Sequence, residues 1–277
     1  MIGQLKRSLR TFFRITRQDP RRAFELTQLR LERLFGISLH RIDPLRRRTF
    51  AFELQHTEAW TPDLIPYGNY ALVERLIPDE PAVLSLGVGE DVRFDLALIK
   101  RHNASLYLFD PTPRSARYVA NHNNLGKAEF NQIAIADFDG VLNVYIDDLQ
   151  DSFESTTSVS IVNRDSTATS LQVPCKTIRT IMQEKGISHI DILKIDVEGA
   201  GVAILKGLLD AEVYPTQIAG EFERPPAASD LDNYFDDLRQ IFERLRALGY
   251  RVYRTRPSDK GFQVEVVAAR FGVERPG

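Results

Sequence analysis

The 277-residue sequence has few of the residues that mark several common classes of protein. It holds one cysteine, Cys175, which excludes an internal disulfide and favours a reducing compartment. No run of about 18 or more apolar residues occurs, so no membrane span is expected. The N-terminus lacks the apolar core of a signal peptide. We therefore expect a cytoplasmic protein.

Several catalytic motifs are also missing. The five histidines are scattered without the spacing of metal ligands, so no metal site is expected. Neither G-x-x-x-x-G-K-[ST] nor G-x-S-x-G occurs, so the phosphate-binding loop and the nucleophile elbow have no sequence signature here. Cys175 has no partner pattern nearby and is expected to be inert.

Charge is distributed unevenly along the chain. Residues 1–48 contain 13 Lys or Arg against 4 Asp or Glu, whereas the remainder contains 23 against 34. Apolar residues alternate with basic ones in this segment, which predicts basic amphipathic helices. They would pack on the body or on a second subunit of a homo-oligomer, or contact the inner membrane face peripherally. Nucleic acid is not expected, because no basic stripe with stacking aromatics occurs elsewhere.

From Ala82 onward, strand-like apolar runs alternate with helical patterns, which predicts an α/β fold with a mostly parallel sheet. The last two runs, YRVYRTR and GFQVEVVAA, predict an antiparallel hairpin. Residues 57–70, rich in Pro and Gly, are expected to form an irregular connector. We expect a helical extension over residues 1–60 and an α/β domain over residues 61–277.

Residues 152–170 do not fit this alternation, since ten of the nineteen are Ser or Thr. A surface loop, an edge hairpin and a lid over a site all remain open.

The stretch SLGVGED runs from an apolar strand into two glycines and then a helix. Gly87 and Gly89 would let the backbone turn sharply and approach a ligand. A dinucleotide fingerprint needs a third glycine where Val92 stands, and Glu90 and Asp91 would repel a diphosphate. A ligand with a cationic sulfonium suffers less from these charges. A purely structural turn is the alternative.

An acid follows the next predicted strand. Asp110 lies 21 residues after Gly89, where a carboxylate can accept hydrogen bonds from the two hydroxyls of an adenosine ribose. Helix capping before Pro111 is the alternative. At the end of the third strand, backbone groups around Ile135 and Asp137 would lie near the adenine.

The stretch ILKIDVEGA ends a buried strand in two acids. Asp196 and Glu198 are two residues apart on a strand, so their side chains share a face. With Glu221, at the end of the next strand, they would form an acidic patch that orients a cation or supplies a general base. Helix capping by Glu198 is the alternative.

The segment from Val173 to Gly207 closely resembles the characteristic segment of the FkbM-type methyltransferases, with LKIDVEG matching in order. GEFERP resembles the strand that follows, and SLGVGEDVRFD with LFDPT resembles a branch that includes the methyltransferase-like proteins. The resemblance covers about residues 82–225. It implies a Rossmann-like class I methyltransferase fold, whose seven-stranded, mostly parallel sheet ends in an antiparallel strand. It also implies S-adenosyl-L-methionine as methyl donor, commonly for O-methylation of a hydroxyl on a sugar, glycan or small natural product.

By position, the resemblance puts Gly87 and Gly89 under the cofactor, Asp110 at its ribose and Asp196 at its sulfonium. Ser85 stands where many methyltransferases have an acid for the amino group, so Glu90 or Asp91 would compensate.

A second departure is Gly201, where a second glutamate is usual, which would alter the acceptor pocket. For the general base we favour Glu198, with Glu221 and Glu223 as alternatives.

Two other functions remain open. A nicotinamide-dependent oxidoreductase would fit the two glycines and Asp110, but not the missing third glycine. A non-catalytic scaffold of the same fold would bind anionic surfaces through residues 1–48.

Overall fold

The computed structural model describes residues 44–126, 128–146, 169–223, 231–255 and 263–272. The chain divides into two units, Met1–Phe50 and Ala51–Gly277. The amphipathic pattern before residue 44 and most of the Ser/Thr-rich segment lie outside the described residues, so those expectations stay predictions. The boundary expected at residue 60 also stays a prediction. Within the described residues, no helix is both long and apolar enough to cross a membrane.

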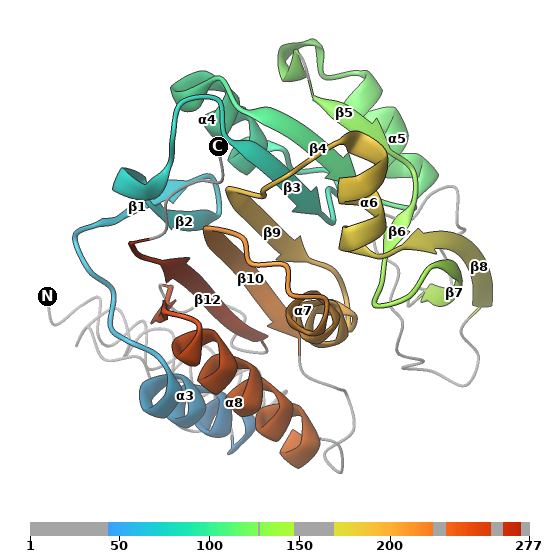
Figure 1. The fold of residues 1–277 in the computed structure, drawn as a ribbon. Coiled ribbons are helices and arrows are strands. Elements are labelled where there is room, and N and C mark those ends of the chain that lie inside the picture. The colour runs from blue at the N-terminus through green and yellow to red at the C-terminus, as the bar shows by residue number, and fades with distance from the viewer. Residues whose placement is uncertain (1–43, 127, 147–168, 224–230, 256–262, 273–277) are drawn as a thin grey trace, which may run out of the picture. The chain divides into compact units, whose positions relative to one another are not determined.

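A seven-stranded sheet forms the centre of the second unit (Figure 1). Its strand order is β11-β12-β10-β9-β3-β4-β5. The strands are β3 (Ala82–Leu86), β4 (Ser105–Phe109), β5 (Glu129–Asn131), β9 (Ile192–Asp196), β10 (Gln217–Glu223), β11 (Tyr250–Arg254) and β12 (Gln263–Arg270). Among these seven strands only β12 runs in the opposite direction, so it pairs antiparallel with both β10 and β11. The expected sheet, with an antiparallel strand at the C-terminal end, is confirmed.

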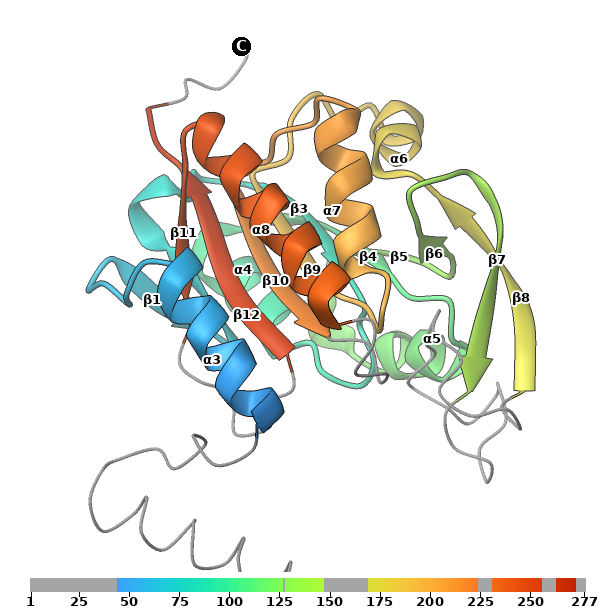
Figure 2. The same cartoon turned by 90° about the horizontal axis from the view of Figure 1, so that it is seen from below.

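Helices cover both faces of this sheet, so its central strands are buried and read as continuous apolar runs. The helices after residue 56 are α4 (Arg93–His102), α5 (Pro113–Ala120), α6 (Ile178–Lys185), α7 (Gly201–Asp210) and α8 (Leu231–Ala247). One hydrophobic cluster joins α6, α7 and α8 to the sheet, and another joins α4 and α5 to it. Figure 2 shows α7 and α8 lying across the same face.

The helix boundaries follow local capping chemistry. The Thr177 hydroxyl accepts a hydrogen bond from the backbone N–H of Thr180 at the start of α6. Gly186 ends this helix with φ +66°, a left-handed conformation that glycine adopts without strain.

The helix α3 (Pro44–His56) precedes the first strand, and its Phe52 ring lies 5.1 Å from that of Phe235 in α8.

The three strands that follow β5 do not join the main sheet. After β5 the chain forms β6 (Ala134–Ile135), which pairs with β8 (Thr169–Lys176). The strand β7 (Gly140–Ile146) also pairs with β8, in antiparallel register, so the three form a separate sheet. Val144, Val173 and Cys175 give this sheet its own small core. Ile135, which is expected near the adenine, therefore belongs to the second sheet and not to the main one.

The prediction of an irregular connector over residues 57–70 is wrong for the second half of this segment. Strands β1 (Leu64–Tyr67) and β2 (Tyr70–Val73) form a hairpin in which Tyr67 pairs with Tyr70. Gly68 in the turn has φ +57°, and a Cβ there would lie 2.6 Å from the backbone nitrogen of Phe94 in α4. The turn is thus packed directly on the start of a helix that borders the glycine loop.

A buried glutamine fastens this hairpin to the main sheet. The Gln217 side chain, fully buried at the start of β10, accepts from the backbone N–H of Val73 at 2.8 Å. Its amide also donates to the Val73 carbonyl at 3.2 Å. One side chain therefore bonds both the backbone N–H and the carbonyl of Val73, whose strand β2 does not pair with the main sheet.

We predict that Gln217→Ala lowers the free energy of unfolding by about 2–3 kcal/mol, because it leaves two buried backbone groups without partners. The matched control is Gln172→Ala on β8, where the amide is exposed and its bond to Asn143 is long at 3.4 Å; we expect a change within about 0.5 kcal/mol. Urea unfolding measures both, and equal losses would contradict the anchoring role.

Candidate active site

A cavity opens at the carboxyl ends of the parallel strands. From β3 the chain continues to β4 and β5 on one side, whereas β9 and β10 lie on the other, so the strand order reverses between β3 and β9. In open α/β sheets, ligands bind outside the sheet at this switch point. The cavity has a volume of about 360 Å³ and is lined mainly by residues at or near the carboxyl ends of β3, β4, β9 and β10.

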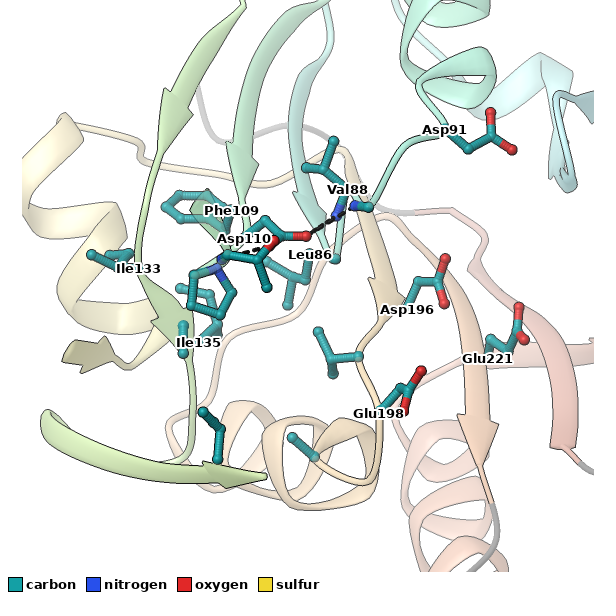
Figure 3. Close-up of a pocket in the computed structure, with 18 of the residues that line it drawn as sticks. Leu86, Val88, Asp91, Phe109, Asp110, Ile133, Ile135, Asp196, Glu198 and Glu221 are labelled. Atoms are coloured by element: carbon teal, nitrogen blue, oxygen red, sulfur yellow. Dashed lines mark hydrogen bonds between the residues drawn. The ribbon is translucent and has the colours of Figure 1, made fainter. Parts of the chain in front are cut away.

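The cavity has an apolar half and an acidic half (Figure 3). Leu86, Phe109, Ile133 and Ile135 line it on the β4 and β6 side. Its carboxylates belong to Glu90, Asp91, Asp110, Asp196, Glu198 and Glu221. Among the described residues, no Lys, Arg or His lines this cavity. The site is therefore suited to a ligand that carries an aromatic group at one end and a positive charge at the other.

The two glycines of the loop after β3 have different roles. Gly87 has φ +78°, and a Cβ there would lie 1.7 Å from the backbone oxygen of Asp196. Gly89 has φ +55°, and a Cβ there would meet nothing within 4 Å. The requirement for glycine at position 87 therefore comes from the close approach of strand β9, and not from a ligand alone. This approach places the glycine loop next to Asp196.

Asp110 holds the glycine loop in place. One carboxylate oxygen accepts from the backbone N–H groups of Val88 at 3.0 Å and Gly89 at 2.9 Å. The other accepts from the backbone N–H of Thr112 at 2.9 Å and from its hydroxyl at 2.7 Å. A carboxylate has about four acceptor positions. A ribose hydroxyl at Asp110 would therefore share an oxygen that already organises the loop.

The two acids after Gly89 are paired with arginines. The Arg114 guanidinium donates to both oxygens of Glu90, at 2.9 and 2.8 Å. Arg93 donates to Asp91 at 2.6 Å, and Asn69 donates to the same oxygen at 2.7 Å. These hydrogen bonds lower the pKa of both carboxyl groups, so the acids stay ionised at the cavity's edge.

A buried polar cluster lies behind the glycine loop. Lys194, in the middle of β9, is buried, and its Nζ donates to the Gly87 carbonyl at 2.6 Å and lies 3.2 Å from an Asp196 oxygen. Ser85 and Asp95 are fully buried nearby, and within the described residues neither side chain makes a well-aligned hydrogen bond. Burial raises the pKa of Asp95, while the charge of Lys194 and the Ser85 hydroxyl oppose that rise.

Tyr70 lines the cavity beside Glu221 and Lys194. Its hydroxyl lies 3.5 Å from a Glu221 oxygen, its ring centroid lies 5.3 Å from Lys194 Nζ, and the ring packs edge-on against Phe94. Burial, followed by the charges of Asp196 and Glu221, raises the pKa of Tyr70 well above its usual value. The phenol therefore stays protonated and acts as a hydrogen-bond donor.

The structure brings together most of the residues expected in the site. The cavity wall includes Gly87, Gly89, Glu90, Asp91, Asp110, Ile135, Asp196, Glu198 and Glu221. Glu221 pairs in register with Asp196 on β9 and accepts from the Gln263 amide. Ser85 lies beneath the loop rather than in the wall, and Asp137 lines a different crevice beside Gly207.

Gly201 and Glu223 also lie outside the cavity wall. A Cβ at Gly201 would lie 3.1 Å from the Phe222 ring and 3.3 Å from Ile195, so this glycine serves the packing of α7 on the sheet.

Sequence reasoning missed Asn69, Tyr70 and Lys194. The first two had a signal, because the pair Gly68-Asn69 between two apolar runs is typical of a two-residue hairpin loop. Lys194 also had one, since a lysine in an otherwise apolar central strand must find buried partners. The positions of Asn69 and Tyr70 in the wall, and of Lys194 behind the glycine loop, depend on tertiary packing that no local pattern reports.

The sheet order, the glycine bend and the acid-lined cavity at the switch point together define a Rossmann-like methyltransferase. The family model described as Methyltransferase FkbM domain matches residues 74–252. The chain belongs to this family of methyltransferases, and S-adenosyl-L-methionine is its cofactor.

Solved methyltransferases are distantly similar to the chain. Human methyltransferase 10 domain containing protein is 11% identical over 92% of this chain and 98% of that one, with a TM-score of 0.40. A methyltransferase from Pyrococcus furiosus is 12% identical over 91% and 98%, with a TM-score of 0.36. Precorrin-6y C5,15-methyltransferase from Geobacter metallireducens is 9% identical over 70% and 81%, with a TM-score of 0.37. The comparison with curated proteins gives no match. The family match carries the assignment.

We predict that Gly87→Ala costs at least about 3 kcal/mol of stability, because its Cβ would overlap backbone that has no flexible end to move. Gly89→Ala is the matched control, since it changes only a left-handed glycine with open space around it and should cost about 1–2 kcal/mol. Chemical denaturation of the two variants measures the difference, and equal costs would show that the contact with Asp196 is not restrictive.

Proposed function

We propose that the protein transfers a methyl group from S-adenosyl-L-methionine to a hydroxyl oxygen of a sugar, a glycan or a small natural product. The observation that carries the proposal is the division of one cavity into an apolar half and an acidic half at the switch point. S-adenosyl-L-methionine has the complementary arrangement, with a flat adenine at one end and, at the other, a cationic sulfonium next to a zwitterionic amino-acid group.

The residues present fit this cofactor. Leu86, Phe109 and Ile135 offer an apolar surface for the adenine. Asp110, at the end of β4, is our candidate for the ribose contact, which it would make while holding the backbone of Val88 and Gly89. Asp196 is our candidate for the sulfonium end, because its side chain is 43% exposed and lines the cavity.

The bound cofactor would supply the electrophilic methyl group. The acceptor oxygen forms the new O–CH₃ bond as the S–CH₃ bond breaks, and the hydroxyl proton must go to a base. Glu198 and Glu221 both line the cavity and are the candidates for that base. Tyr70, which stays protonated, would donate a hydrogen bond and is not itself the base. Holding the acceptor in line supplies much of the rate.

An oxidoreductase that uses a nicotinamide dinucleotide is less well supported. A pyrophosphate carries negative charge, and the loop that would bind it presents Glu90 and Asp91 instead. Thermal-shift measurements with NADH and with S-adenosylhomocysteine separate the two functions. We expect stabilisation by S-adenosylhomocysteine alone, whereas stabilisation by NADH alone would contradict the proposal.

We predict that Asp110→Ala weakens S-adenosyl-L-methionine binding by about 100-fold or more, because two loop N–H groups lose their acceptor and the ribose contact is lost with them. Glu198→Gln keeps the shape of the side chain and should change the affinity by no more than about threefold. Isothermal titration calorimetry measures both dissociation constants. Unchanged binding by the Asp110→Ala variant would overturn the assignment of the ribose contact.

A further inference from the structure

A cluster of three buried polar side chains lies between the main sheet and α4. Ser85 on β3 and Lys194 on β9 are direct partners in register, so their side chains leave the same face of the sheet. Asp95, in the first turn of α4, approaches them from the helix, and all three residues are buried. All three also lie outside the cavity wall, so any effect of Asp95 on a ligand passes through a neighbour.

The start of α4 does not explain why an acid is buried there. Val92 is the N-cap residue, and the carboxylate that accepts from the first backbone N–H of the helix belongs to Asp91. The other buried residues of this helix, Phe94 and Leu98, are apolar. The helix dipole favours an acid in the first turn, but by less than the burial of a carboxylate costs. Asp95 therefore requires a buried cation as its partner.

Lys194 is the cation that acts on Asp95. Burial is the largest effect on the Asp95 carboxyl and raises its pKa, whereas the charge of Lys194 and the Ser85 hydroxyl lower it. The Lys194 ammonium in turn donates to the Gly87 carbonyl at 2.6 Å and lies 3.2 Å from an Asp196 oxygen. Lys194 therefore connects an acid behind the glycine loop with the loop itself and with an acid of the cavity wall.

A lysine is an unfavourable neighbour for a cationic ligand. Its ammonium lies beside Asp196, our candidate for the sulfonium end of the cofactor. At this place an ammonium can hold the glycine loop, but like charges repel, so it also opposes the binding of a sulfonium. The site needs the hydrogen bonds of Lys194 without its full positive charge.

We propose that Asp95 is a positioning residue of the donor site: its carboxylate compensates the charge of Lys194, which can then hold the glycine loop next to a bound sulfonium. This inference rests on the proposed function. The buried pair of Asp95 and Lys194 has no net charge, while the lysine keeps its bond to the Gly87 carbonyl. The sulfonium then meets Asp196 without an uncompensated ammonium behind that acid.

Isothermal titration calorimetry with the full chain tests this compensation, because S-adenosyl-L-methionine carries a positive sulfur and S-adenosylhomocysteine a neutral one. Asp95→Asn leaves the ammonium of Lys194 without its compensating charge. We expect this variant to weaken the binding of the sulfonium compound by about tenfold and that of the thioether by no more than about threefold. A merely structural role for Asp95 would weaken both by the same factor, so an equal loss, or no loss, overturns the proposal.

The matched control is Asp191→Asn, which removes a buried acid at the amino end of the strands, opposite the cavity. The Asp191 carboxylate accepts from the backbone N–H of Ala82 at 2.8 Å. Its loss should lower the melting temperature and leave the ratio of the two affinities within about twofold of the wild-type value. A change of this ratio as large as that in Asp95→Asn would contradict the specific role of Asp95.

A double variant tests the pairing itself. Asp95→Asn combined with Lys194→Met removes both charges, so we expect the preference for the sulfonium compound to return at least to the wild-type ratio. The loss of stability in urea should be smaller than the sum of the two single losses, because each single change leaves a buried charge unpaired. An additive loss, or a ratio that stays as low as in Asp95→Asn, overturns the pairing.

Folding gives a second measure of the same pair. If Asp95→Asn does not fold, a double variant that folds supports the pairing, and a double variant that also fails to fold overturns it. Circular dichroism distinguishes these outcomes. If the wild-type protein binds neither compound, the proposed function fails, while urea unfolding still reports on the pair.

Discussion

The site depends on one buried ammonium. Lys194 lies in a central strand between the apolar residues Leu193 and Ile195, and its Nζ reaches both the Gly87 carbonyl and the Asp196 carboxylate. A buried charge is tolerated only when it is paired and hydrogen-bonded, so the glycine bend and the acid are held as the partners this lysine requires. Because Gly87 has no Cβ, its backbone can also lie directly against the backbone of Asp196. Strand β9 and the loop after β3 therefore form one unit.

Around this unit, each wall of the cavity is fastened by its own polar contact. Asp110 fixes the glycine loop through two hydrogen bonds, from Val88 and Gly89, and Gln217 fixes the hairpin that carries Tyr70 through two bonds to Val73. These contacts join buried side chains to backbone groups. The result is a preorganised site in which apolar and acidic surfaces face each other across the switch point.

Much of the fold could be predicted from the sequence, because its elements have strong local signals. The period of α8, the cap at Thr177, the stop at Gly186 and the final hairpin all come from patterns within a few residues. The acids at the ends of β4 and β9 were also predictable, since parallel strands place their carboxyl ends at one edge. The KIDVEG run then indicated the family.

What the sequence did not predict depends on contacts between distant residues. The hydrogen-bond partners of Asp110 could not be inferred, because a carboxylate after a strand can face a ligand or the backbone of nearby loops equally well. Strand β6 belongs to a second sheet because it pairs with β8, which lies more than thirty residues further along the chain. No local pattern reports such a pairing. Tyr70 entered the wall only because a hairpin before the main sheet folds against α4 and β10.

The central claim is that the bend at Gly87 and the acid at Asp196, joined through Lys194, form a single pocket for an adenosyl sulfonium. A crystal structure of the protein with S-adenosylhomocysteine tests it most directly. The account predicts adenine against Phe109 and Ile135, with the sulfur facing Asp196. Density for the ligand at another place on the protein, or a cavity occupied by the chain's own side chains, would contradict it.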